Sequence, residues 1–224
     1  MRKLIIAIDG PAGAGKSTVA RLAAQRLCYA YIDTGAMYRA ITWKAIYEKV
    51  DMDNTILAEM AFNMDLQLVY SDDGTRVYVD QTDVTEAIRT PEVSRLVPVV
   101  AQVSGVRQAL VDLQRKLAVG GGVVMDGRDI GTHVLPNADI KIFLTASIDE
   151  RAKRRWLELK AKDIEVNIDQ LKQEIADRDK TDSEREISPL IQAKDAVVID
   201  TTHLSIPEAV EKILSLCEGM ACCV

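Results

Sequence analysis

The chain has 224 residues, of which 48% are hydrophobic, and it carries a net charge of −6. Its length and composition predict one large domain, or a domain with an inserted piece, built around a sizeable core. The acidic balance excludes a protein that coats nucleic acid or an anionic membrane, so basic residues that serve the function must be placed locally.

The first predicted elements flank a glycine-rich loop. Residues 4–8 form a short apolar run typical of a buried parallel strand, and residues 17–27 carry apolar side chains on one helical face. The segment between them fits the pattern G-x-x-x-x-G-K-[ST] of a phosphate-binding P-loop. Its N–H groups would face the anion, Lys16 would add a positive charge, and Ser17 would offer a hydroxyl to Mg²⁺. The predicted ATP-binding residues are Gly10, Pro11, Ala12, Gly13, Ala14, Gly15, Lys16, Ser17 and Thr18.

The next predicted pair is a strand at residues 31–33, which ends at Thr34-Gly35, and a helix from Ala36 to about Glu48. Arg39 lies one turn into this helix and follows a strand end, where α/β proteins bind ligands. We therefore favour a ligand-binding role for Arg39 over a solvated one. The residues expected to face the core are Met37, Ile41, Ala45 and Tyr47.

Residues 62–104 are interpreted as an insertion. Two runs with alternating apolar residues, 66–70 and 77–79, are joined by a turn at Asp73-Gly74 and predict a β-hairpin. An antiparallel hairpin does not belong to a series of parallel strands and crossover helices. Just before the insertion, Asp53 is expected to cap a short helix.

A helix that contains a proline is predicted in the second half of the insertion. Thr90-Pro91-Glu92 supplies its N-cap, its first residue and an acid in its first turn. Pro98 lies inside the apolar pattern, so we expect a kink or a helix end near Leu96–Val97. Ser104 is expected to cap the following helix, on which Arg107 lies off the apolar stripe.

The second half of the chain returns to alternating strands and helices. Residues 123–126 are expected to form a buried strand that ends in Asp126 and is followed by a charged tip, and residues 140–144 another strand. Ser147 and Glu150 are expected to form a capping box at the start of a helix. A basic run on that helix is typical of a solvated face. The run consists of Arg151, Lys153, Arg154 and Arg155.

Three elements complete the predicted order. A helix starting at Asn167 ends in a polar stretch, a strand covers residues 196–199, and a last helix starts at Ser205. The polar stretch carries Arg178, Asp182 and Arg185.

This alternation predicts an α/β fold: a P-loop NTPase core with a parallel sheet flanked by helices, plus the small inserted domain with its β-hairpin. The loops at the carboxyl ends of the strands hold residues 10–17, 33–39 and 126–129, which are expected to form one site. A phosphate cradle surrounded by arginines suits phosphoryl transfer, which needs positioning and positive charge. Asp126 and Ser17 are the expected ligands of Mg²⁺.

The cysteines predict the compartment. Cys28, Cys217 and the pair Cys222-Cys223 show neither zinc-binding spacing nor a disulfide framework, which is typical of a reducing cytoplasm. The apolar run after Met1-Arg2-Lys3 is too short for a signal peptide, and no run reaches membrane-spanning length. We therefore expect a cytoplasmic protein without membrane or nucleic-acid partners, and Cys222-Cys223 in a frayed tail.

Four segments together resemble the bacterial cytidylate kinase family. They are the P-loop, the D-T-G-A-M-Y-R segment at 33–39, the D-G-R-D-I-G-T segment at 126–132 and the charged stretch 178–185. The resemblance covers essentially the whole chain. It implies a monomeric kinase that moves the γ-phosphoryl group of ATP onto CMP or dCMP with Mg²⁺. The implied parts are a core at about 1–61, 105–150 and 186–224, an NMP-binding insertion at about 62–104 and a lid region at about 151–185.

Matched positions imply residue roles. Arg39 and Arg128 resemble ligands of the acceptor phosphate, Arg107 and Asp129 resemble readers of cytosine, and Asp182 with two arginines resembles the group that holds the sugar and phosphates. The residues expected to bind the acceptor are Thr34, Arg39, Arg107, Arg128, Asp129, Arg178, Asp182 and Arg185. The expected catalytic residues are Lys16, Arg128, Arg178 and Asp126. Pro98 and Ala12 depart from the family, because some relatives carry there a serine that touches the base or the acceptor phosphate.

Two alternatives stay open. A kinase of the same architecture could act on UMP or a small hydroxy acid, and the pair Arg107 and Asp129 separates that alternative from a CMP kinase. A nucleotide-dependent switch could hydrolyse ATP or GTP and report to a partner. No guanine-reading N-K-x-D segment follows the strand at 140–144, and the many arginines suit a second phosphate, so the switch is less favoured.

Overall fold

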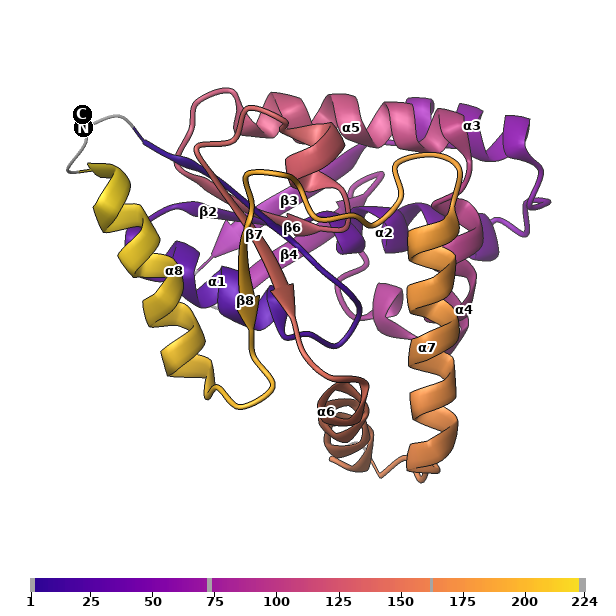
Figure 1. Ribbon diagram of the computed structural model, residues 1–224. Coiled ribbons are helices and arrows are strands. Elements are labelled where there is room, and N and C mark those ends of the chain that lie inside the picture. Colours follow the sequence, from indigo (N-terminus) through magenta and orange to yellow (C-terminus); the bar gives the residue numbers. More distant parts are fainter. Residues whose placement is uncertain (1–2, 72–73, 162, 222–224) are drawn as a thin grey trace.

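A five-stranded parallel sheet forms the centre of the molecule (Figure 1). The computed structural model describes residues 3–71, 74–161 and 163–221. The strands lie in the order β2-β6-β1-β7-β8, and each neighbouring pair runs parallel. Their bounds are β1 Ile5–Asp9, β2 Ala30–Asp33, β6 Val123–Gly127, β7 Ile140–Thr145 and β8 Val197–Asp200.

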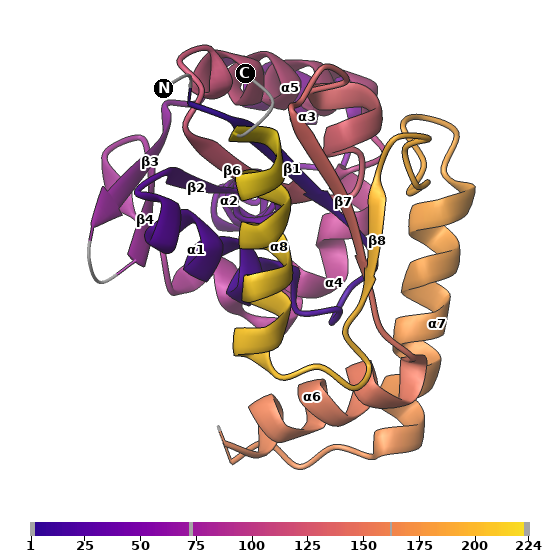
Figure 2. The ribbon, with the colours of Figure 1, turned by 60° about the vertical axis from the view of Figure 1, so that its left-hand side comes forward.

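Helices cover both faces of the sheet, which explains why its strands are almost continuously apolar. On one face, Ile6 and Ile8 pack with α1 (Lys16–Leu27) and α8 (Ile206–Ala221), which Figure 2 shows on the same side. On the other face, Ala7 and Met125 pack with α2 (Thr34–Tyr47) and α5 (Ser104–Ala118). The predicted α/β fold with a parallel sheet is confirmed.

The register of the strands brings their carboxyl ends to one edge. Asp9 lies opposite Gly127, and Asp33 lies opposite Asp126. The chain turns sharply after β1 at Gly10, whose φ is +148°. A Cβ atom there would lie 1.9 Å from the carbonyl oxygen of Leu144 in β7, so only glycine fits this exit from the strand.

A second, antiparallel sheet lies between α2 and α5 in the sequence, as predicted. Its strands pair in the order β3-β4-β5, and the hairpin pairs Ser71 with Gly74. Gly74 therefore belongs to a strand, whereas Asp73, the other residue of the predicted turn, lies outside the described residues. Buried residues of this sheet join the core that contains α2. The bounds are α3 Asn54–Asn63, β3 Leu66–Ser71, β4 Gly74–Val79, β5 Thr82–Asp83, η1 Ala87–Arg89 and α4 Pro91–Val100.

The helices α6 (Ile148–Lys160) and α7 (Ile168–Glu184) lie beside each other at one end of the sheet (Figures 1 and 2). They share a small core of their own around Ala152, Leu171 and Ile175. The helix predicted to start at Asn167 begins at Ile168, and Asn167 caps it by accepting hydrogen bonds from two backbone N–H groups. The short helical turn η2 (Ile130–Val134) follows β6 and contacts β1 and α5.

Two predictions about α2 are wrong. The helix begins at Thr34 rather than Ala36, because the Asp33 carboxylate accepts from the Ala36 N–H at 2.8 Å and caps it earlier. Tyr47 is 72% exposed and stacks on Trp43. Two residues of helix rotate the side chain by about 200°, so Tyr47 lies opposite the buried Ala45.

Two predicted caps are also wrong, wholly or in part. Ser104 is already the first helical residue of α5, and its N-cap is Val103, which makes no side-chain cap. Ser147 accepts from the Glu150 N–H at 3.2 Å, but the second half of the capping box is missing. The Glu150 carboxylate bonds Arg154 instead, and the Ser147 N–H donates to Thr202.

The helix α4 does not end near Leu96–Val97 but continues through Pro98 to Val100, so the expected helix end is wrong. Proline removes one backbone donor, and the buried Val93, Val97 and Val100 hold the helix in place despite that loss. A kink at Pro98 stays a prediction.

Within the described residues, no single helix is long and apolar enough to cross a membrane. α4 and α5 meet that criterion only together, across a bend of 99°. Cys28 and Cys217 are free thiols, and the predicted tail pair Cys222-Cys223 lies outside the described residues.

Candidate functional site

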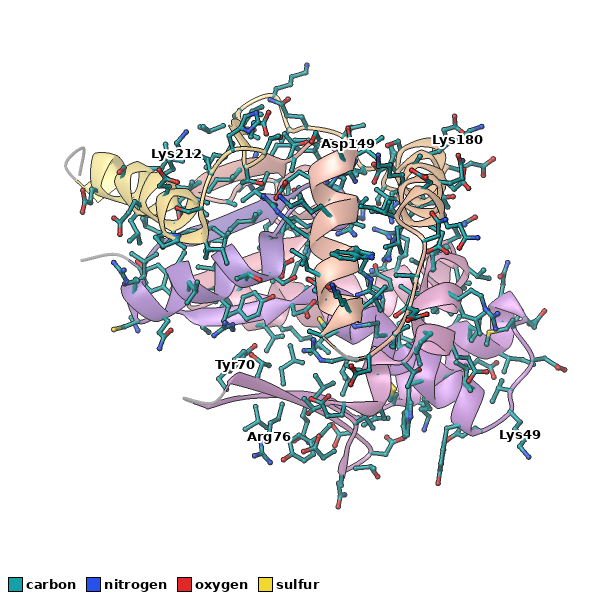
Figure 3. All side chains as sticks on the ribbon, turned by 90° about the horizontal axis from the view of Figure 1, so that it is seen from below. Lys49, Tyr70, Arg76, Asp149, Lys180 and Lys212 are labelled. Carbon is teal, nitrogen blue, oxygen red and sulfur yellow. The ribbon has the colours of Figure 1, made fainter. Side chains whose placement is uncertain are left out.

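A cavity of about 1470 Å³ opens at the carboxyl edge of the sheet. The three predicted loops line it together with α4, α6 and α7, which confirms that these loops form one site. Figure 3 views the molecule from the side on which α6 lies. Cavities for one small ligand usually measure about 300–1,000 Å³, so this one has room for two nucleotides.

The P-loop occupies the turn between β1 and α1, where the sequence predicted it. Residues 12–18 line the cavity, whereas Gly10 and Pro11 lie behind the lining. Lys16 is buried, and its ammonium group donates to the Pro11 carbonyl oxygen at 2.8 Å. Burial, together with the nearby positive charge of Arg128, lowers the pKa of Lys16. An anion beside Lys16 would restore its charged form.

Asp126 and Ser17 meet at the end of β6, as the sequence predicted. The Ser17 hydroxyl donates to one oxygen of Asp126 at 3.1 Å, and the Tyr31 hydroxyl donates to the other at 2.8 Å. Burial raises the pKa of Asp126, and the two hydroxyl donors oppose that shift. Thr34 belongs to the same group, because its hydroxyl donates to the Asp126 carbonyl oxygen at 2.7 Å.

The Asp126–Ser17 pair fits a magnesium ion. Mg²⁺ takes oxygen ligands and usually binds one or two protein groups, with water and substrate phosphates completing its shell. Among the described residues, no group of three or more His, Cys, Asp or Glu side chains is arranged to hold a metal. The donor set therefore suits a metal that arrives with phosphates and not a metal enclosed by protein.

Arginines with unsatisfied donors line the cavity beside the P-loop. Arg39, Arg107 and Arg178 each have a buried Nε atom without a hydrogen-bond partner within the described part of the chain. Arg128 donates to Asp182 at 2.9 Å, and Arg39 donates to Asp33 at 2.8 Å. Buried donors without acceptors are costly, so these atoms indicate a ligand rich in acceptor oxygens.

Positive charges also crowd one another on this side. Burial and the neighbouring Arg128 lower the pKa of Arg178 to about 10. Burial and Arg107 likewise lower the pKa of Arg185. Bringing like charges together is unfavourable unless an anion lies between them. This arginine-rich part of the cavity therefore suits a negatively charged ligand.

The predicted base readers lie together. Arg107 is 3% exposed and donates to Asp129, which also accepts from Arg185 at 3.3 Å. The Arg107 guanidinium lies 5.8 Å from the centre of the Tyr38 ring, and burial raises the pKa of Tyr38 to about 12. Arg107 lies off the apolar stripe, as predicted, but it is buried against the cavity. Pro98 lines the same cavity.

Two buried residues escaped the sequence analysis. Asp9, at the end of β1, accepts from the N–H groups of Ile130 and Gly131, each at 2.7 Å, and so holds the chain beside Asp129. Burial raises the pKa of Asp9 to about 6. Tyr31 holds Asp126 from behind. An acid at the end of a buried strand was the only available signal for Asp9.

The basic run on α6 is only partly a solvated face, so that expectation needs correction. Lys153 and Arg155 are exposed, but Arg151 is 4% exposed and donates to the Ala12 carbonyl oxygen. Arg154 donates to the carbonyl oxygens of Ala14 and Thr201. The pattern of charges in the sequence did not predict these contacts of Arg151 and Arg154, because it does not show which backbone carbonyl oxygens can accept from them.

Comparisons with known proteins show which family and fold the chain resembles. A family model described as cytidylate kinase matches residues 6–219. The chain is 58% identical to a cytidylate kinase of Bacillus subtilis, covering 97% of each chain, and 54% identical to one of Bacillus cereus, covering 98% of each. Among solved structures it is similar to a shikimate kinase from Acinetobacter baumannii, with a TM-score of 0.50, 16% identity and coverage of 97% and 94%. An uncharacterised protein from Eubacterium ventriosum gives a TM-score of 0.53, 14% identity and coverage of 96% and 98%. These two likenesses show the fold alone.

Proposed function

This chain belongs to the cytidylate kinase family, and we propose that it transfers the γ-phosphoryl group of ATP to CMP or dCMP, giving ADP and CDP or dCDP. The observation that carries the proposal is that one cavity is lined by two cationic groups. One is the P-loop with Lys16, and the other is a set of arginines with unpaired buried donors. A site with two phosphate-binding halves suits transfer between two nucleotides.

On the donor side, the loop N–H groups and Lys16 would bind the phosphates of ATP. Ser17 and Asp126 would hold Mg²⁺, which neutralises charge that develops on the phosphate oxygens when it is bound. Tyr31 keeps the Asp126 carboxylate oriented by donating to it. Lys16 would exchange its bond to Pro11 for a bond to phosphate.

On the acceptor side, Arg39, Arg128 and Arg178 would bind the phosphate of CMP. Arginine can grip a phosphate with two parallel hydrogen bonds, which lysine cannot do. Asp182 already accepts from Arg128, and with Arg185 it would orient the sugar. Transfer then requires alignment of the two phosphates more than covalent chemistry from the protein.

Asp129 and Arg107 would read the base. A carboxylate can accept from the N4 amino group of cytosine, and a guanidinium can donate to N3 or O2. Uracil places an acceptor and a donor where cytosine has the reverse, so it would leave these groups mismatched. Their mutual ion pair leaves free lone pairs on Asp129 and the unpaired Nε of Arg107 for this task.

Large segments around the cavity would move. We propose a core at about 1–61, 105–150 and 186–224, an NMP-binding insertion at about 62–104 and a lid region at about 151–185. α4 of the insertion and α7 of the lid both line the cavity and contact each other, so movement of these segments would open the site or enclose both nucleotides and exclude water. The enzyme is further proposed to act as a monomer in the cytoplasm.

The test is a coupled assay of ADP release with ATP and Mg²⁺. CMP, dCMP, UMP and shikimate, a small hydroxy acid, are offered in turn, and a mixture without acceptor serves as the control. We expect fast release with CMP and dCMP, slow release with UMP and only background with shikimate or without acceptor. Preference for UMP or shikimate would reveal a kinase for another acceptor, and equal release without acceptor would indicate a hydrolysing switch.

A further inference from the structure

Three cationic side chains donate to carbonyl oxygens of the P-loop. The N–H groups of a P-loop are expected to face the bound phosphates, so the carbonyl oxygens of the loop need other partners. The Pro11 oxygen accepts from Lys16 at 2.8 Å, the Ala12 oxygen from Arg151 at 3.0 Å and the Ala14 oxygen from Arg154 at 3.3 Å. Two of these donors come from α6, which lies in the proposed lid region.

Arg151 joins the loop to a second helix. Its Nη1 and Nη2 atoms donate to the two carboxylate oxygens of Asp179 in α7, at 3.0 Å and 2.6 Å. Its Nε atom donates to the Ala146 carbonyl oxygen at 3.0 Å. This fork-to-fork arrangement fixes both side chains in orientation as well as in distance. A Cβ atom at Gly13 would lie only 3.2 Å from the Arg151 Cβ, so loop and helix are also closely packed.

Asp179 lies next to the acceptor group of α7. Arg178 is its neighbour in sequence, and Asp182 and Arg185 follow at spacings of one and two helical turns from Arg178. Arg178, Asp182 and Arg185 line the cavity. One buried side chain, Arg151, therefore bridges the ATP cradle and the helix that carries the acceptor ligands.

We propose that Arg151 and Asp179 are positioning residues that couple the occupancy of the ATP site to that of the acceptor site. This inference rests on the proposed function. Phosphates bound in the P-loop fix the loop, the Ala12 carbonyl fixes Arg151, and Arg151 fixes the position of α7. Binding of one nucleotide then strengthens binding of the other, and the coupling is equal in both directions.

The test measures the dissociation constant of CMP by calorimetry, with and without a saturating β,γ-imido analogue of ATP and Mg²⁺. The ratio of the two constants is compared for wild type, Asp179→Asn and Arg151→Lys. The matched control is Asp149→Asn, because Asp149 pairs with Lys172 at 2.7 Å between the same two helices but is 80% exposed and lies away from the loop. Arg151→Lys keeps the positive charge but loses the paired hydrogen bonds to Asp179, so it provides the same test if Asp179→Asn fails to fold.

We expect the analogue to tighten CMP binding about 5- to 150-fold in wild type, the usual range of coupling. Asp179→Asn and Arg151→Lys should bring the ratio close to one, while Asp149→Asn should keep it. In wild type, the analogue alone should also slow hydrogen exchange at residues 178–185, and in Asp179→Asn it should not.

Three results would overturn the coupling: a wild-type ratio of one, a ratio kept in both variants, or an equal loss in Asp149→Asn. These results leave the proposed function standing if wild type still phosphorylates CMP. A wild-type chain that binds neither nucleotide would overturn the proposed function and the coupling with it.

Discussion

Replacing Tyr31 by phenylalanine tests how far the magnesium site depends on the group behind its ligand. The Tyr31 hydroxyl is buried and donates to Asp126 at 2.8 Å, and the substitution removes that single oxygen. Loss of a partner that orients a metal ligand costs about 10- to 100-fold in metal affinity. The lost donor also lets the pKa of Asp126 rise further, because the Tyr31 bond favours the ionised carboxylate.

The assay is a Mg²⁺ titration of ADP release at fixed ATP and CMP, repeated between about pH 5 and pH 8. The half-saturating Mg²⁺ concentration should rise about 10- to 100-fold in Tyr31→Phe. Activity should also disappear at a higher pH than in wild type, because protonation of Asp126 removes the ligand. Calorimetric titration of Mg²⁺ with ADP gives the same comparison without turnover.

Tyr29→Phe is the matched control. The Tyr29 hydroxyl accepts from the Leu4 N–H at 3.1 Å and lies away from the cavity, so its loss should leave the Mg²⁺ requirement unchanged. A folded Tyr31→Phe chain with a wild-type Mg²⁺ requirement would refute the reasoning, since Ser17 alone would then suffice to orient Asp126.

Three proposed features and one buried acid give further predictions. Lys16→Ala should fold and lose about 10²–10³-fold in the turnover measured by ADP release, because its charge faces phosphate. Asp129→Ala should lower kcat/KM for CMP more than for UMP in parallel assays, because the carboxylate accepts from the cytosine amino group. Hydrogen exchange at residues 151–161 and 178–185 should slow when both nucleotides are bound, because the lid closes over them. Asp9→Asn should gain stability relative to wild type as the pH rises. Burial raises the pKa of Asp9 from 3.8 to about 6. Protonated Asp9 therefore adds to the free energy of unfolding of the wild type fully below pH 3.8, and this addition is lost as the pH rises through 6. Urea unfolding at pH 4 and pH 7 should show a relative change of about 2 kcal/mol.

Each of these predictions has a contrary result. Near-normal turnover in Lys16→Ala would contradict the role of the P-loop, and an unchanged CMP-to-UMP ratio in Asp129→Ala would show that this residue does not read the base. Equal exchange with and without nucleotides would exclude lid closure. If the difference in free energy of unfolding between Asp9→Asn and wild type stays constant with pH, the pKa of Asp9 is the same in the folded and the unfolded chain.

The sequence predicted the core of the fold because its signals were local and agreed with one another. A strand, a glycine-rich loop and a helix follow one another around Lys16. Parallel strands of one sheet bring their carboxyl ends to the same edge, whichever segments connect them. The same rule predicted that Asp126 and Asp129 lie in one site with the P-loop, and all of them line the same cavity. The roles of the individual site residues stay predictions.

The errors arose where a contact depends on atoms far away in the sequence. Arg151 reads as a solvated charge until its acceptor, the Ala12 carbonyl oxygen, is seen across 139 residues. Tyr31 and Asp126 are 95 residues apart, and only the pairing of β2 with β6 makes them neighbours. Pro98 failed as a helix terminator because tertiary packing outweighed a local preference.

The sharp turn of the chain at Gly10 restricts which substitutions at this position could give resistance to an inhibitor. A side chain at this position would collide with the Leu144 main chain, which cannot move without separating strands of the sheet. An inhibitor that bonds only to the main-chain N–H groups of the loop would therefore meet few viable resistance substitutions there. Compounds that depend on the exposed side chains of α6 would leave many more.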